Sequence, residues 1–282
     1  MFEERIKKLP AYALGFNTLL IGNAGCGKTT SLATLVKSGL EVFALFSEAN
    51  GQTNFLKALR EAGVTEEEMK RVHFKYIKSG NTGFKVLGDA ATKVLNAPEF
   101  GKIEGGSRSK YDQLVQLMKA CQNFTDQNGV DFGAVDSWGA DRVVCLDSLT
   151  GLNDMAMSLT IGGKPCATQQ DWQVAMKQEM DLVKTFIGVQ CSFVMTAHLS
   201  LEKDEVSGRL IQVPMALGQK NGPALVPLFG DIVLCEKNDK QFTWSTTSAK
   251  TDCLKNSFLP LKSGLKPDFV QIVDNWLKDN GV

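Results

Sequence analysis

The stretch that decides the fold is Thr18–Thr29, which reads TLLIGNAGCGKT. Its first four residues form a short, apolar, partly β-branched run that is typical of a buried strand, and Gly22 ends it. After the glycine-rich turn, Lys28–Ser38 is rich in good helix formers, and Gly39 is a suitable stop for a helix. The sequence therefore predicts a strand, a tight turn and a helix in immediate succession.

The turn matches the pattern G-x-x-x-x-G-K-[ST] at every defined position. Glycines let the backbone close around phosphate groups, so that consecutive N–H groups and the dipole of the following helix face the negative charge. We expect Lys28 to reach the β- and γ-phosphates of ATP, and the Thr29 hydroxyl to ligate Mg²⁺. The candidate nucleotide-binding residues are Gly22, Asn23, Ala24, Gly25, Cys26, Gly27, Lys28, Thr29 and Thr30.

Strand-like and helix-like segments alternate along the rest of the chain. The expected strands are Val42–Phe46, Val72–Tyr76 (third or edge strand), Arg142–Asp147, Ser192–Thr196, Ile232–Cys235 and Phe242–Ser245. The expected helices are roughly Gln52–Ala62, a segment after Tyr111, Trp172–Phe186 and a C-terminal helix over residues 267–279, whereas Leu199–Leu228 has no clear period and is predicted to be a long loop, with room for a hairpin. Such alternation predicts an α/β fold with a mostly parallel sheet and helices on both faces.

No internal repeat, low-complexity tract or linker divides the chain. We expect one domain over residues 1–282, with a core at about 17–260 and the C-terminal helix packed on it.

Charge and cysteine content narrow the classes of function. The 31 basic and 31 acidic residues cancel, so a global attraction to nucleic acid or to an anionic membrane is excluded and only a local patch remains. The 7 cysteines show no zinc or redox spacing, which favours a reduced, cytoplasmic setting. The charged start Met1–Pro10 does not fit a signal peptide, and no apolar stretch reaches the roughly 18 residues of a membrane span.

Two acidic residues at predicted strand ends are candidates for the chemistry. Asp147 follows the apolar run Val143–Leu146, where an acid can hold the Mg²⁺ shell beside the phosphate loop, although an aspartate there also commonly starts a turn. Ser148, and not a second acid, follows it. Glu48 follows the second strand and is the candidate base, because the carboxyl ends of parallel strands gather on the ligand side; the alternative is a surface glutamate opening a loop.

His198 follows the strand Ser192–Thr196, so its imidazole suits a contact with the γ-phosphate or with water. A histidine that only caps the strand is the alternative. His73 lies within a strand-like alternation and is interpreted as structural.

This order of motifs resembles the RecA-like branch of P-loop ATPases, and most of all the short single-domain members encoded by bacteriophages, several of which assist recombination or single-strand annealing. The resemblance implies Mg²⁺-dependent ATP hydrolysis by a protein that acts on DNA in phage-type recombination, annealing or replication. The resemblance covers about Thr18–Pro260 and rests on the phosphate loop, Ser47-Glu48, Leu146-Asp147-Ser148-Leu149 and Thr196-Ala197-His198. It implies that Glu48 is the catalytic base, Asp147 the Mg²⁺ partner and His198 a switch residue. It also implies a host-cell cytoplasmic location.

The resemblance further implies a ring or filament of identical subunits, with ATP between subunits and a basic residue supplied in trans. Lys250 and Lys255 lie near the corresponding late strand, without the arginine often found there, and two solvated lysines are the alternative. Single-stranded DNA is the implied partner. The facing stretch Leu199–Leu228 gives it little direct support, because Lys203, Arg209 and Lys220 are balanced by Glu202, Asp204 and Glu205 and no aromatic residue is present for base stacking.

Two other functions share the phosphate loop. A nucleotide-gated assembly or binding protein would use ATP to stabilise an interface, with incidental hydrolysis. A small-molecule kinase would need an arginine-bearing lid, and the 6 arginines (Arg5, Arg60, Arg71, Arg108, Arg142 and Arg209) form no such cluster.

Overall fold

The fold is taken from a computed structural model, which describes residues 2–78, 84–96, 111–162, 164, 166–203, 208–239 and 241–282. The elements of the first half are α1 (Phe2–Ile6), β1 (Asn17–Ile21), α2 (Lys28–Leu32), the 3₁₀ helix η1 (Ala33–Ser38), β2 (Glu41–Phe46), α3 (Ala49–Glu61), α4 (Glu66–Met69), β3 (Val72–Tyr76), α5 (Phe84–Asn96), α6 (Gln113–Gln122) and the 3₁₀ helix η4 (Val135–Ser137). The elements of the second half are β4 (Arg142–Asp147), α7 (Leu149–Ile161), α8 (Gln169–Gly188), β5 (Ser192–Ala197), β6 (Leu199–Lys203), β7 (Leu210–Pro214), α9 (Gly218–Leu225), the 3₁₀ helix η5 (Val226–Leu228), β8 (Asp231–Asn238), β9 (Gln241–Ser245) and α10 (Val270–Asp279).

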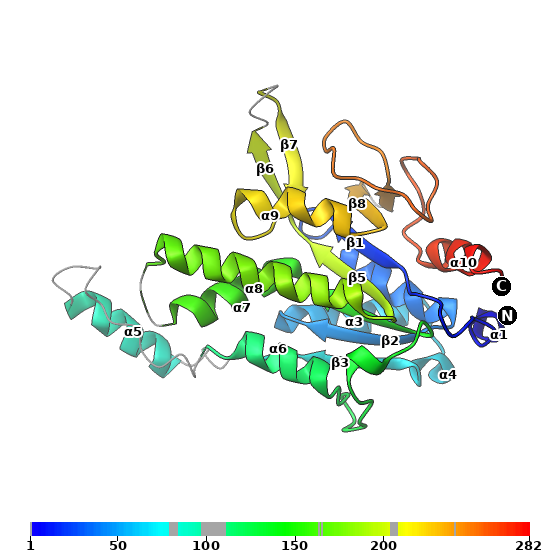
Figure 1. The fold of residues 1–282 in the computed structure, drawn as a ribbon, viewed down its shortest axis with the longest axis horizontal. Helices are drawn as coiled ribbons and strands as arrows, with labels where there is room; N and C mark the ends of the chain where they lie inside the picture. Colours follow the sequence, from blue (N-terminus) through cyan, green and yellow to red (C-terminus); the bar gives the residue numbers. More distant parts are fainter. Residues whose placement is uncertain are drawn as a thin grey trace.

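A seven-stranded sheet organises the molecule, in the order β3-β2-β4-β5-β1-β8-β9 (Figure 1). All neighbouring strands run parallel except β9, which is antiparallel to β8. Because β1 lies between β5 and β8, the loop that leaves Ile21 opens at the carboxyl end of an inner strand of the sheet. The predicted α/β class with a mostly parallel sheet is confirmed.

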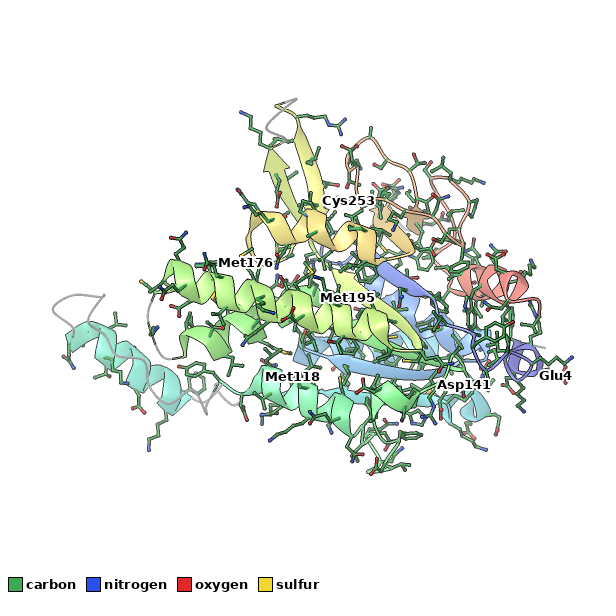
Figure 2. All side chains as sticks on the ribbon, in the orientation of Figure 1. Glu4, Met118, Asp141, Met176, Met195 and Cys253 are labelled. Carbon is green, nitrogen blue, oxygen red and sulfur yellow. The ribbon has the colours of Figure 1, made fainter. Side chains whose placement is uncertain are left out.

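Both faces of the sheet are buried, and β2 shows how. Val42, Ala44 and Phe46 belong to one apolar cluster with residues of η1, α3 and α10, whereas Phe43 and Leu45 belong to a second cluster with residues of α6, α7 and α8. Successive strand side chains point to opposite faces, so a strand covered on both sides must be apolar throughout. Figure 2 contrasts a buried and an exposed side chain: Met195 of β5 lies in the interior of the protein, whereas Glu4 of α1 lies at its surface.

The prediction of a long loop over Leu199–Leu228 was wrong, whereas the hairpin for which the sequence left room is present. The segment forms the antiparallel β6–β7 hairpin, followed by α9 and η5. The hairpin stands away from the sheet (Figure 1) and leaves Leu201 and Leu210 exposed, so it lacks the one-sided burial that produces a readable period.

Helix α9 contains Gly218, Gly222 and Pro223, which are poor helix formers, and a tertiary contact replaces the missing propensity. The fully buried Glu179 of α8 accepts the Leu217 N–H at 3.1 Å and the Asn221 side-chain N–H at 2.6 Å. Burial raises the pKa of this carboxyl group, and the two donors act against that rise. A contact between residues 38 to 42 positions apart is not visible in local sequence.

Four further helical segments differ from the sequence predictions. The helix predicted over Lys28–Ser38 is α-helical only to Leu32 and then continues as the 3₁₀ helix η1, and α3 begins at Ala49 rather than near Gln52. Helices α5 and α7 had no sequence prediction. In α7 the Ser148 hydroxyl accepts the Gly151 N–H at 3.3 Å, so this residue caps the helix rather than extending the preceding strand. The glycine, asparagine and threonine residues within α7 mask the helical period of its apolar residues.

No helix within the described residues is long and apolar enough to cross a membrane. All seven cysteines are free thiols.

The C-terminal helix α10 is part of the apolar core. Trp276 is 1% exposed, its ring meets Phe16 edge-on with centroids 5.6 Å apart, and its indole N–H donates to the Leu14 carbonyl at 3.0 Å. The helix therefore joins the end of the chain to the segment that enters β1.

Replacing Trp276 by alanine should lower the free energy of unfolding by about 3–5 kcal/mol, because it removes a buried ring and leaves a cavity. Trp172→Ala is the matched control, since this tryptophan is 41% exposed. Urea denaturation measures both, and equal midpoints for the two variants would contradict the assigned packing of α10.

Candidate functional site

The loop between β1 and α2 has the backbone geometry of an anion cradle. Gly27 takes φ of +87° directly before α2 begins at Lys28, and Gly25 takes φ of +73°. At Gly27 a Cβ atom would also lie 2.7 Å from Cγ of the Phe242 ring. Only glycine fits this position, both for its conformation and for its contact.

The Lys28 ammonium lies inside the loop. It donates to the Gly22 carbonyl at 2.7 Å and to the Asn23 carbonyl at 2.9 Å, and it lies 3.7 Å from the Cys26 sulfur. The side chain is only 7% exposed. A cation held by neutral carbonyls in a concave loop is a suitable partner for a phosphate group.

Asp147, at the end of β4, connects three elements of the site. Its Oδ2 accepts the Thr29 hydroxyl of α2 at 2.7 Å, and its Oδ1 accepts the Thr196 hydroxyl of β5. Strand β5 lies between β4 and β1, so the carboxylate reaches past one strand to meet the loop. Asp147 therefore lies beside the phosphate loop, and its role as the Mg²⁺ partner stays a prediction.

Ser47 joins the ends of β2 and β4. Its N–H donates to the Asp147 carbonyl at 2.9 Å, and its hydroxyl accepts the Ser148 N–H at 3.0 Å. A Cβ atom on Gly151 would lie 1.9 Å from the Ser47 oxygen, so only glycine lets α7 approach so closely. These contacts fix the chain on both sides of the candidate acids.

Glu48 follows Ser47 and immediately precedes α3. Its side chain is exposed to the cavity, and the Ser148 hydroxyl donates to its Oε1 at 3.4 Å. Glu48 and Asp147 therefore lie at the carboxyl ends of the adjacent strands β2 and β4.

His198 lines the same cavity from the end of β5. Partial burial, and then the positive charge of Lys28, lower the pKa of its imidazole, while the carboxylates of Glu48 and Asp147 act in the opposite direction. The lowered pKa leaves this ring neutral at pH 7, able both to donate and to accept a hydrogen bond.

His73 has a different environment. Its Nδ1 lies 3.1 Å from an Asp126 carboxylate oxygen, its Nε2 lies 3.3 Å from Glu41, and its ring stacks on Phe43. The residue belongs to edge strand β3 and does not line the cavity, in agreement with a structural role.

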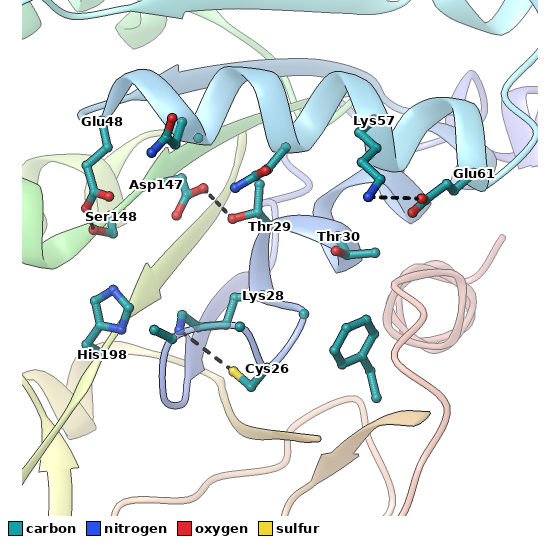
Figure 3. Close-up of a pocket in the computed structure, with 17 residues that line it drawn as sticks. Cys26, Lys28, Thr29, Thr30, Glu48, Lys57, Glu61, Asp147, Ser148 and His198 are labelled. Carbon is teal, nitrogen blue, oxygen red and sulfur yellow. Dashed lines mark hydrogen bonds and ion pairs between the residues drawn. The ribbon is translucent and has the colours of Figure 1, made fainter. Parts of the chain in front are cut away.

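The cavity has a volume of about 580 Å³. Figure 3 shows Glu48, Ser148 and His198 at one end and Thr30, Lys57 and Glu61 at the other, with Lys28 and Thr29 between them. The sequence did not predict its lining residues Asn50, Gly51, Asn54, Lys57, Glu61, Ser148 and Phe242. Asn50, Asn54, Lys57 and Glu61 recur at helical spacing on α3, so a polar stripe was a readable signal, whereas Phe242 gave none.

The oxygen donors at Thr29 and Asp147 fit a magnesium ion. Mg²⁺ takes one or two protein oxygens and completes its shell with water and substrate phosphates. A hydroxyl and a carboxylate oxygen 2.7 Å apart, next to a phosphate-type loop, supply that set. The parts of the chain that the structure describes contain no cluster of three or more His, Cys, Asp or Glu side chains that would hold a metal on its own.

The two lysines considered for a role in trans lie at opposite ends of the parallel strands. Lys250 pairs with Glu236 at 2.7 Å, beyond the carboxyl end of β1, and is exposed. Lys255 pairs through its backbone with Ile232 at the start of β8, and its ammonium donates to the Phe229 carbonyl. Of the two, Lys250 lies on the side of the phosphate loop.

Comparisons with known proteins add little. No family model matches the chain, and no curated protein matches it in sequence. Among solved structures it is similar to the RadB recombinase, with 14% identity over 86% of each chain and a TM-score of 0.36. A TM-score this low supports no conclusion about function, so the functional argument rests on the geometry of the site.

Cys26 lies in the phosphate loop, and its thiol has a lowered pKa. A hydrogen bond from the Cys235 thiol and the charge of Lys28 lower its pKa to about 6, against the effect of burial. Burial raises the pKa of Cys145, which belongs to the core of β4. Thiolates are the reactive form of cysteine.

Iodoacetamide should therefore alkylate Cys26 with a half-maximal rate near pH 6, and leave Cys145 unmodified in the folded protein. Mass spectrometry of the two peptides after short pulses across pH 5–9 measures this. A half-maximal rate for Cys26 near the ordinary thiol pKa of about 8.5 would contradict the assigned contacts.

Proposed function

We propose that this chain is a Mg²⁺-dependent, RecA-like ATPase. The observation that carries the proposal is the meeting of Thr29 and Asp147, 118 residues apart, within 2.7 Å of each other beside the Lys28 loop. The loop N–H groups and Lys28 would bind the triphosphate tail, and Thr29 and Asp147 would hold Mg²⁺. The bound ion would neutralise charge on the β- and γ-phosphate oxygens.

Glu48 is the proposed general base. Its carboxylate lines the cavity, and the Ser148 hydroxyl orients one of its oxygens at 3.4 Å. It would accept the proton of the water that attacks the γ-phosphorus, and ADP would leave as that bond forms. The neutral imidazole of His198 at the same end of the cavity would hydrogen-bond the attacking water or the γ-phosphate.

Lys28→Ala should weaken ATP binding about ten- to hundredfold, because it removes a charge-assisted contact with phosphate. Glu48→Gln should retain ATP binding and lower the hydrolysis rate about a hundredfold or more, because it removes the base but keeps the shape. Isothermal titration and phosphate release measure the two quantities, with Lys177→Ala, an exposed lysine of α8, as control.

Undiminished ATP affinity in Lys28→Ala would refute the nucleotide site. A Glu48→Gln protein that loses hydrolysis but keeps its biological role would instead identify a nucleotide-gated assembly protein.

The second part of the proposal is that the ATPase acts on DNA, and the β6–β7 hairpin supports it. His198, which lines the cavity, directly precedes β6, and its carbonyl accepts the Met215 N–H at 2.8 Å just after β7. A shift of His198 at the γ-phosphate end of the cavity would therefore move the base of the hairpin, which projects from the sheet (Figure 1). Lys203 is exposed on it, whereas Asp204 and Glu205 of the predicted charge balance lie outside the described residues.

We expect single-stranded DNA to increase the ATPase rate several-fold, and bound ATP to increase the particle mass in steps of one subunit. Parallel assays with single-stranded DNA, double-stranded DNA and no DNA measure the first, and light scattering measures the second. An ATPase rate that no DNA changes would remove DNA from the proposal and leave the ATPase in place.

A further inference from the structure

Phe242 of β9 is an aromatic residue beside the phosphate loop that has no part in the core. Its side chain is half-buried and lines the cavity together with the loop residues. Among the described residues, it belongs to neither of the two apolar clusters that cover the sheet. The next side chain on the same face of the strand, Trp244, is fully buried in one of them.

The ring lies directly against the loop. Its Cγ would be 2.7 Å from a Cβ atom placed on Gly27, the residue immediately before the phosphate-binding Lys28. A triphosphate held by the loop would thus have this ring as a neighbour. Glu48 and His198, which lie at the hydrolytic end of the cavity, are supplied by other strands.

Phe242 also lines a second hollow of about 440 Å³, with Gln241, Thr243, Gly264, Leu265, Lys266 and Pro267 as its other lining residues. The ring therefore stands where the two hollows meet. A ligand that extends from the phosphate loop past Phe242 has room beyond it.

The outer edge of β9 presents backbone groups to this second hollow. Trp244 exchanges both of its backbone hydrogen bonds with Leu265, at 2.9 and 2.8 Å, and so directs its N–H and C=O away from β8. Bonding direction alternates along an antiparallel strand, so the N–H and C=O of Phe242, two residues earlier, face the same edge. Such a donor and acceptor pair can meet the polar edge of a nucleobase.

We propose that Phe242 and the hollow beside it form the nucleobase subsite, with the base stacked on the Phe242 ring. The inference rests on the proposed nucleotide site and extends it to the part of the ligand that the loop does not hold. A nucleobase offers a π face to an aromatic ring. Replacing a stacked aromatic residue by alanine typically weakens binding about five- to hundredfold.

The test compares two ligands, ATP and inorganic tripolyphosphate, both with magnesium chloride, by titration calorimetry. Phe242→Ala should weaken ATP binding about five- to hundredfold and leave tripolyphosphate binding unchanged, and Phe242→Tyr should retain both. Phe242→Leu keeps apolar bulk against Gly27 and should behave like the alanine variant. Phe84→Ala, which changes a 93% exposed ring on α5, is the control.

Equal ATP affinity in wild type and Phe242→Leu would overturn the subsite alone. A loss of tripolyphosphate binding equal to the loss of ATP binding would also overturn it, because the ring would then act only by shaping the loop. A wild-type protein that binds neither ligand would refute the proposed function, and the subsite with it.

Discussion

The site depends on one carboxylate that is bound from two sides. Asp147 accepts one hydroxyl from Thr29 and another from Thr196, so the end of β4, the end of β5 and the start of α2 are held at a single point. A buried acid needs such donors, because an unpaired charge away from water is strongly unfavourable. The same two donors aim one carboxylate oxygen at the phosphate loop, so the contacts that stabilise the acid also place it for chemistry.

The parallel sheet makes this arrangement possible. Because both faces are covered, the inner strands β2, β4 and β5 are apolar along most of their length, and their polar side chains lie at or near the ends. At the carboxyl end, Ser47 and Asp147 leave adjacent strands and are linked through backbone and side chain. Residues from distant parts of the sequence thus share one cavity, without any of them interrupting the core.

The proposed nucleotide would lie along this edge, from the hydrolytic end at Glu48 and His198 to the ring of Phe242. The β6–β7 hairpin begins directly after His198, and Met215 closes its base. The hairpin leaves Leu201 and Leu210 exposed, and α9, which follows it, is hydrogen-bonded to the buried Glu179 of α8. A projecting element joined to the reacting end of a cavity is a physical route by which turnover could affect a bound partner.

The amino-acid sequence by itself determined the strand, loop and helix at Thr18–Ser38, the alternation of the sheet, and the candidates Lys28, Thr29, Glu48, Asp147 and His198, because apolar runs and glycine spacing are local properties. The other residues of the site come together only through long-range contacts in the folded chain. Phe242 reaches the loop through pairing of β9 with β8, and α9 forms through a contact with a helix about 40 residues earlier. Both depend on partners distant in sequence, and no local period records such partners.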